Sequence, residues 1–80
     1  MIKNIVLSLV TNYNDWEVLY IDDEILREGH SVDVFESLSS VINNIDVNIT
    51  FNKYIGDELV FEEEDYTNLS NILYCLDSVY

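Results

Sequence analysis

The chain has 80 residues, with 16 Asp and Glu against three Lys and Arg, so its formal net charge at pH 7 is −13. Because 49% of the residues are hydrophobic, the composition indicates one folded domain over residues 1–80 rather than a disordered acidic tail. The charge excludes direct binding to nucleic-acid phosphates and to an anionic membrane surface. The single cysteine excludes a disulfide framework.

The apolar run near the N-terminus is not expected to be a targeting signal. It covers residues 5–10, is interrupted by Ser8 and is followed by no small-residue cleavage site. Such a run is too short for a signal peptide or a membrane span. We therefore expect a cytoplasmic protein in which Cys75 stays reduced.

Three strands are expected in the first part of the chain, at residues 2–11, 16–21 and 24–28. The first has apolar residues at both alternating sets of positions, which favours a strand well inside a sheet. Asp22 and Asp23 fit a tight hairpin turn between the second and third strands, because Asp tolerates turn geometry. Gly29 gives the backbone freedom to leave the sheet.

A helix is expected over residues 32–44, with Ser31 as its N-cap and Asp33 in its first turn. Asn43 and Asn44 can end it, because Asn accepts the left-handed cap conformation. Its apolar stripe, which would lie on the sheet, consists of Val34, Leu38, Val41 and Ile45, with Phe35 and Ile42 beside it.

The second half of the chain predicts a strand at residues 46–54 with one solvated face, and a short strand or docking loop at Leu59–Phe61. A second amphipathic helix is expected from about Asp65 to Ser78. Its stripe consists of Tyr66, Leu69, Ile72, Leu73, Leu76 and Val79. The order β-β-β-α-β-(β)-α indicates an α+β domain, with an antiparallel-rich sheet and two helices on one face.

The acidic residues gather in two groups that we predict to bind a partner. The first, around the hairpin, includes Asp22, Asp23, Glu24 and Glu28; the second consists of Asp57, Glu58, Glu62, Glu63, Glu64 and Asp65. Solvation and helix-dipole compensation would account for any single acid. These effects do not explain the acids as a whole, because thirteen uncompensated charges on a small fold repel one another and destabilise it. Tyr74, on the polar side of the last helix, is predicted to join this surface.

The expected partner is the basic surface of a nucleic-acid-binding protein. Carboxylates can stand where phosphates would stand and accept the same hydrogen bonds from Arg and Lys. Electrostatic steering would then make association fast and sensitive to salt. The sequence leaves open whether the protein is a monomer or a homodimer.

No catalytic, metal or cofactor site is predicted. The acids lack the spacing of a calcium loop, and the glycines that a phosphate-binding loop needs are absent. His30 and Cys75 are the only candidates for a base and a nucleophile. A packing role explains both residues better than a catalytic one. We expect His30 to pack at the strand-to-helix corner, and Cys75 to be half-buried beside the stripe of the last helix.

Residues Asp15 to Asp22, with the sequence D-W-E-V-L-Y-I-D, and the G-H-S step at Gly29-His30-Ser31 resemble a pattern in small acidic phage and prophage proteins. By size and charge the chain is also similar to anti-restriction and anti-CRISPR inhibitors. The first resemblance supports a phage or mobile-element source and implies no activity. Together with the net charge of −13 on a chain that has its own core, the second favours a non-catalytic inhibitor of a nucleic-acid-binding host defence protein. The alternative is an antitoxin, an immunity protein or a dimerising accessory protein of a phage or plasmid.

Overall fold

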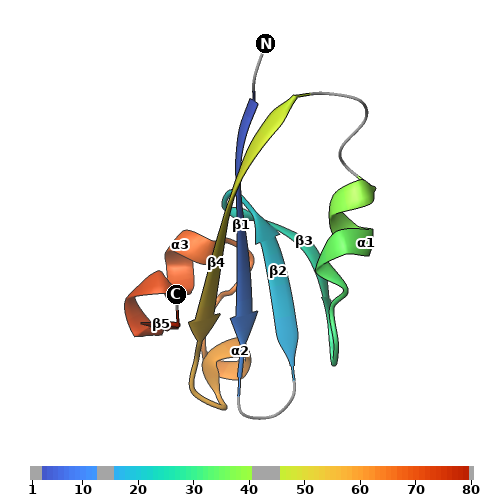
Figure 1. The fold of residues 1–80 in the computed structure, drawn as a ribbon. Helices are drawn as coiled ribbons and strands as arrows, with labels where there is room; N and C mark the ends of the chain where they lie inside the picture. The colour runs from blue at the N-terminus through green and yellow to red at the C-terminus, as the bar shows by residue number, and fades with distance from the viewer. Residues whose placement is uncertain (1–2, 13–15, 41–45, 80) are drawn as a thin grey trace.

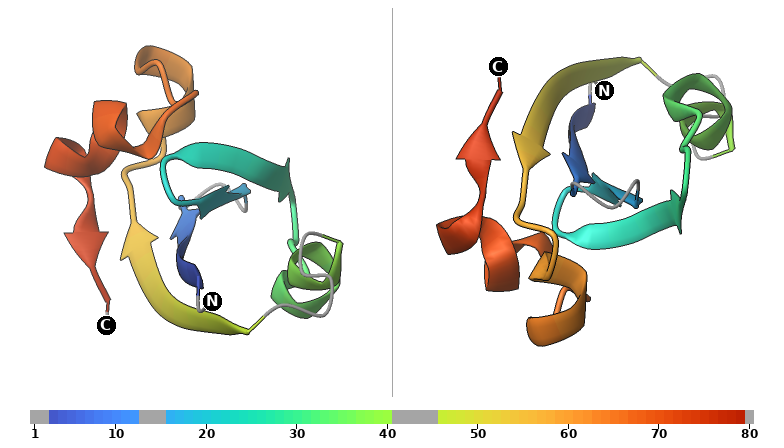
Figure 2. Two further views of the ribbon diagram at one scale, coloured as in Figure 1. Left: turned by 90° about the horizontal axis from the view of Figure 1, so that it is seen from above. Right: turned by 90° about the horizontal axis from the view of Figure 1, so that it is seen from below.

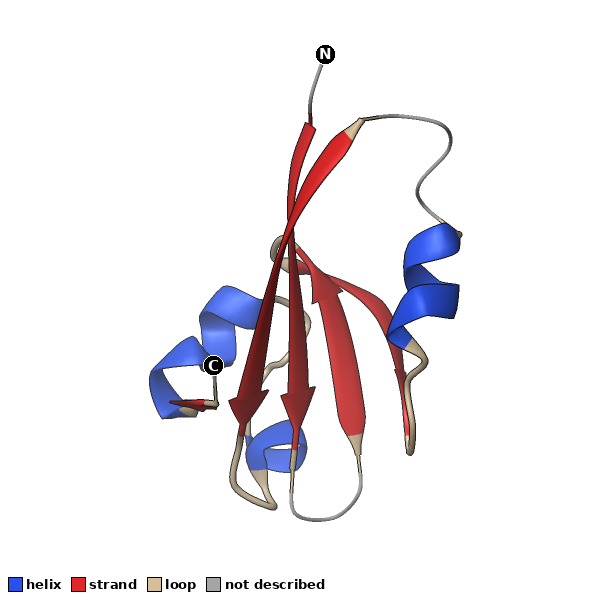
Figure 3. Ribbon diagram, in the orientation of Figure 1, coloured by secondary structure: helices blue, strands red, loops and turns tan. Residues whose placement is uncertain are grey.

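The computed structural model describes residues 3–12, 16–40 and 46–79. Its strands form one mixed sheet in the order β3-β2-β1-β4-β5, in which β1 and β4 are parallel and the other neighbours antiparallel (Figure 1). The strands are β1 (Lys3–Thr11), β2 (Glu17–Ile21), β3 (Glu24–Gly29), β4 (Val47–Ile55) and β5 (Asp77–Ser78). The helices are α1 (Val34–Ser39), α2 (Val60–Glu63), α3 (Leu69–Ile72) and the 3-10 turn η1 (Leu73–Cys75). The predicted α+β class and antiparallel-rich sheet are confirmed, with strands dominant (Figure 3).

The sheet is covered on both faces, so two hydrophobic cores form. The α1 face is the side on which α1 packs, and its core consists of Ile5, Leu7, Leu9, Leu19 and Val32. The α3 face is the side that carries α2 and α3, and its core consists of Val10, Val18, Tyr20, Val60, Leu69 and Ile72. Figure 2 shows α1 and the pair α2 and α3 on opposite sides of the curled sheet.

The expectation that the helices cover one face is therefore wrong. β1 and β2 carry apolar side chains at both alternating sets of positions, and each set needs cover. The same alternation confirms that β1 lies inside the sheet, because β2 and β4 flank it.

Helix α1 is shorter than expected, and Ser31 is not its N-cap. The cap is Asp33, whose Oδ1 accepts a hydrogen bond from the Glu36 amide at 3.0 Å. Phe35, expected beside the buried stripe, is 85% exposed. The predicted stripe and stop residues Val41, Ile42, Asn43, Asn44 and Ile45 lie outside the described residues.

The predicted strand or loop at Leu59–Phe61 is wrong, because α2 begins at Val60. The predicted helix over residues 65–78 is also wrong in its extent: only the short α3 and η1 form, and β5 then pairs with β4. At its start, the Asp65 carboxylate accepts hydrogen bonds from both the amide and the hydroxyl of Thr67, which favours a turn. At its end, the Val79 amide donates to the Lys53 carbonyl at 2.8 Å, which holds the chain extended along the sheet.

The hairpin between β2 and β3 forms as predicted, with Asp22 in the left-handed region at φ 55°. The register of β2 and β3 then shifts by one residue. Tyr20 lies opposite Ile25 but the next residue, Leu19, lies opposite Arg27, which leaves Leu26 as an extra residue in β3. Within the part of the chain that the structure describes, no helix is long and apolar enough to cross a membrane.

Candidate binding surface

The positive charges of the chain all belong to the α1 face. The alternation of side chains places Lys3 beside Val47 and Lys53 beside Leu9, both at positions that face the α1 core. Arg27 lies 3.5 Å from Glu36 of α1, in an exposed ion pair. Since these three are the only Lys and Arg residues of the sequence, the α3 face has no Lys or Arg to offset its acids.

The structure brings the two predicted acidic groups together on the α3 face. The extra residue Leu26 in β3 lets Ile25 and Glu28 lie on the same side of the sheet, although they are three positions apart. Glu28 thereby reaches Tyr66, which follows the acidic segment 57–65. Asp23 of the hairpin contacts Ser70 at the start of α3. Glu24 is the exception, because it lies opposite Ile21 on the α1 face.

Several of these acids accept hydrogen bonds from within the chain and thereby stabilise the fold. Asp23 accepts hydrogen bonds from the amide and hydroxyl of Ser70, at 2.6 and 3.0 Å. Asp22 accepts from the amide of Val6, and Asp57 from the amide of Leu59. The two hydrogen bonds from Thr67 lower the pKa of Asp65. Solvation alone therefore does not explain these acids, because their carboxylates accept hydrogen bonds from backbone amides at turns and at the start of α3.

The tyrosines of this face are tied to the same carboxylates. The buried Tyr20 hydroxyl donates to the Tyr66 carbonyl at 2.6 Å, and the Tyr66 hydroxyl donates to Glu28 at 2.7 Å. Burial, together with the nearby Tyr66 and negative charges, raises the pKa of Tyr20 well above its usual range, and the hydrogen bond to Glu28 raises that of Tyr66. The exposed Tyr74 donates to Glu64 at 2.6 Å, which raises the pKa of Tyr74 to about 12.

Most of the predicted site is exposed, and only Asp23 and Glu64 are partly buried. The exposed members are Asp22, Glu24, Glu28, Asp57, Glu58, Glu62, Glu63, Asp65 and Tyr74. Within residues 3–12, 16–40 and 46–79, the Glu62 and Glu63 side chains make no hydrogen bond or ion pair. Both lie on α2, in the second half of the segment 57–65.

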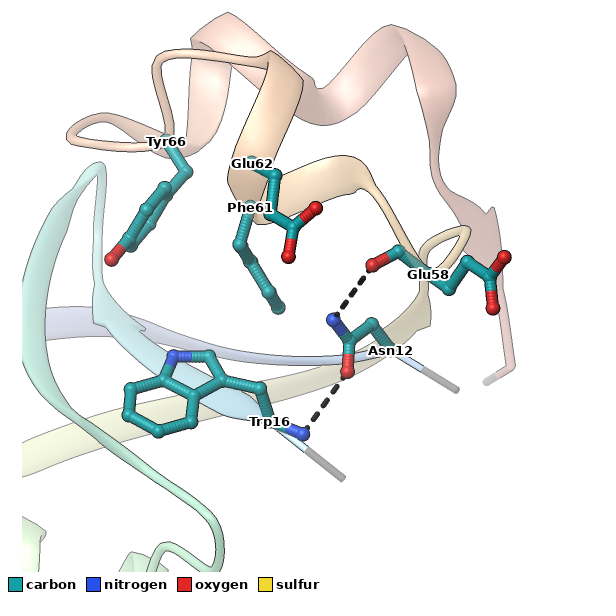
Figure 4. A pocket seen from close by; sticks show the side chains of 6 residues that line it. All are labelled: Asn12, Trp16, Glu58, Phe61, Glu62 and Tyr66. Atoms are coloured by element: carbon teal, nitrogen blue, oxygen red, sulfur yellow. Dashed lines mark hydrogen bonds between the residues drawn. The ribbon is translucent and has the colours of Figure 1, made fainter. Parts of the chain in front are cut away.

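An open pocket of about 270 Å³ lies between α2 and the ends of β1 and β2 (Figure 4). Aromatic rings and polar groups share its wall, which consists of Asn12, Trp16, Glu58, Phe61, Glu62 and Tyr66. Asn12 accepts a hydrogen bond from the Trp16 amide at 3.0 Å, and its side-chain amide donates to the Glu58 carbonyl at 3.4 Å. Sequence reasoning missed Asn12, Trp16 and Phe61, because their separation in the chain gives no local pattern.

The sequence offered few candidates for a metal ligand, a base or a nucleophile, and the structure places them as follows. No group of three His, Cys, Asp or Glu side chains is arranged to hold a metal ion within residues 3–12, 16–40 and 46–79. His30 packs edge-on against Trp16 at 5.0 Å, as a corner residue would. Cys75 is exposed rather than half-buried, and desolvation and Glu64 raise its pKa, which disfavours the reactive thiolate.

The α1 face carries a second, apolar hollow of about 430 Å³, lined by Leu7, Val34, Phe35, Leu38, Ile49 and Phe51. Its lining is apolar, whereas the pocket beside α2 is lined partly by polar groups. A comparison of the chain with protein-family models, curated proteins and solved structures gives no significant match.

Proposed function

We propose that this protein is a non-catalytic inhibitor that uses its α3 face to cover the basic, nucleic-acid-binding surface of a bacterial host defence protein. The observation that carries the proposal is the segregation of charge: every Lys and Arg belongs to the α1 face, while the acids of segment 57–65 and Glu28 gather on the α3 face. A surface of one sign attracts a partner of the other sign and raises the association rate.

The geometry supports a preorganised acidic surface. Hydrogen bonds within the chain hold Glu28, Glu64 and Asp65 in fixed positions, so that little side-chain entropy is lost when a partner binds. The accessible surface of the described protein is 5252 Å², and a standard interface of about 800 Å² from each partner would take roughly 15% of it. One face of the domain is large enough for such an interface.

The phage source rests on the resemblance of the D-W-E-V-L-Y segment to phage and prophage proteins, and the inhibitor class rests on overall size and charge alone. The proposed mechanism is occupation: carboxylates accept the Arg and Lys hydrogen bonds that nucleic-acid phosphates would otherwise accept.

The test compares two variants that each remove three negative charges, one inside the segment 57–65 and one outside it. The first is Glu58→Gln, Glu62→Gln and Glu63→Gln on the α3 face. The control is Glu24→Gln, Glu36→Gln and Asp46→Asn, at exposed positions outside that segment. The unmodified protein is used to capture proteins from bacterial lysate. Each captured protein is purified, bound to its labelled DNA or RNA, and mixed with the unmodified protein or with either variant.

We expect the unmodified protein and the control to displace the nucleic acid, with an effect that weakens as NaCl increases, and the α3-face variant to lose this activity. A partner that keeps its nucleic acid while bound, or equal displacement by both variants, would overturn the proposal.

A further inference from the structure

The pocket between Trp16, Phe61 and Tyr66 has a chemistry that differs from the rest of the acidic face. We infer that it is a binding site for one guanidinium group, supplied by an arginine side chain of the partner. This inference rests on the proposed function for its source of arginine, and it adds the specific contact by which that partner is anchored.

The aromatic walls suit a flat cation. Trp16 and Phe61 approach the pocket from opposite sides, with Tyr66 beside Phe61 (Figure 4). Phe61 and Tyr66 meet edge to face, with ring centroids 5.0 Å apart. The faces of aromatic rings attract cations, Trp most strongly, and the planar guanidinium can also stack on them.

The charge around the pocket selects a cation over an anion. Figure 4 shows the Glu62 carboxylate directed toward the space beside Phe61, whereas the Glu58 side chain extends away from Trp16. Glu28 adds a second carboxylate next to two of the lining residues, because its Oε1 accepts from both Trp16 Nε1 at 3.3 Å and the Tyr66 hydroxyl at 2.7 Å. A phosphate or carboxylate ligand would be repelled, whereas a guanidinium gains charge-assisted hydrogen bonds.

The pocket walls are held in place before any ligand enters. The single carboxylate oxygen of Glu28 fixes both Trp16 and Tyr66, while Asn12 fixes the Trp16 backbone. A wall that is already ordered costs little entropy on binding. The volume of about 270 Å³ lies just below the range of about 300–1,000 Å³ that is usual for small-molecule sites, which suits one inserted side chain.

The chain offers a direct reporter, because Trp16 is its only tryptophan. The probe is the peptide acetyl-Gly-Arg-Gly-amide, titrated at low salt while Trp16 fluorescence and backbone amide NMR shifts are recorded. Acetyl-Gly-Lys-Gly-amide tests whether any cation suffices, and acetyl-Gly-Glu-Gly-amide tests the sign of the charge.

We expect weak, saturable binding of the arginine peptide, weaker binding of the lysine peptide and none of the glutamate peptide. Glu62→Gln should weaken arginine binding about three- to fivefold. Glu63→Gln is the matched control, because it removes the same charge from the same helix but from a side chain that does not line the pocket. It should change the affinity less than about 1.5-fold. Both residues are exposed, so both variants should fold.

The outcomes separate this inference from the proposed function. Equal effects of Glu62→Gln and Glu63→Gln, shifts that map away from Trp16, or no saturable arginine binding would overturn the pocket assignment, while displacement of nucleic acid by the α3 face would still stand. Equal binding of the lysine and arginine peptides would overturn the choice of guanidinium. Specific arginine binding together with no displacement of any nucleic acid would support the pocket and refute the proposed function.

Discussion

Gly56→Ala tests the packing that places α2 over the end of the sheet. Gly56 follows β4 directly, is buried, and donates its amide to the Thr11 carbonyl at 2.8 Å. A Cβ atom at this position would lie 2.8 Å from Val60 Cγ1 and 3.0 Å from Leu76 Cδ2. The Leu76 methyl lies at the end of a flexible side chain, but Val60 is 4% exposed in the core and branched at Cβ. Relief therefore requires α2 to shift.

Overpacking of this kind costs about 1–3 kcal/mol. For a domain of this size each kcal/mol lowers Tm by about 4–8 °C. The assay is urea unfolding followed by circular dichroism, with a lower midpoint expected at an unchanged m-value. Because Phe61 and Glu62 lie on α2, Gly56→Ala should also weaken arginine-peptide binding.

The matched control is Gly29→Ala, where an added Cβ meets nothing within 4 Å and the backbone is not in the left-handed region. It should change the free energy of unfolding by less than about 0.5 kcal/mol. A second check is Gly56→Ala combined with Val60→Ala, whose cost should be smaller than the sum of the two single costs, because the clashing methyl group is gone. Equal stability of the two glycine variants would refute the described packing of α2 against β4.

Three further outcomes are expected. Tyr20→Phe should cost about 1–2 kcal/mol, because it removes the hydrogen bond to the Tyr66 carbonyl. Because the pKa of Tyr20 is raised in the folded state, this hydroxyl loses its proton at a lower pH in the unfolded chain. The free energy of unfolding should therefore fall as the pH rises above about 10, and less steeply in Tyr20→Phe. Urea unfolding at several pH values measures the cost of the substitution and its pH dependence. Asp23→Ala should lower the free energy of unfolding by about 1 kcal/mol, because it removes two hydrogen bonds from Ser70. Its control, Glu24→Ala, removes the same charge and should cost less than about 0.5 kcal/mol. Equal costs would contradict the capping role of Asp23. Raising NaCl from about 20 to 500 mM should increase the free energy of unfolding, since salt screens repulsion among the uncompensated charges; a decrease would show that attractive pairs dominate.

Local chemistry explains what the sequence could predict of the fold. Alternating side chains identified β1, β2 and β4, and two adjacent Asp residues identified the turn between β2 and β3. These features depend on neighbours along the chain. The predicted last helix failed because its ends were decided elsewhere, by the Asp65 turn and by the pairing of β5 with β4. Its expected stripe is only partly buried, since Leu73 and Val79 are exposed.

The candidate site was predicted only in part. Acidic residues were identified from composition and spacing, but the sequence did not show that Glu24 faces away from Glu28, since that depends on the extra residue Leu26 in β3. Nor did it show the pocket, because Trp16 and Phe61 are brought together only when α2 lies over the strand ends.

The sequence by itself determined a small, strongly acidic domain with an apolar central strand and a Lys- and Arg-poor surface, because these properties follow from composition and from side-chain alternation. The tertiary structure decided which face each charge occupies. Strand register and the β3 irregularity put all three Lys and Arg on the α1 face. They gathered Glu28, the acids of segment 57–65 and the rings of Trp16, Phe61 and Tyr66 on the other. That separation depends on contacts between residues tens of positions apart, which no local pattern encodes.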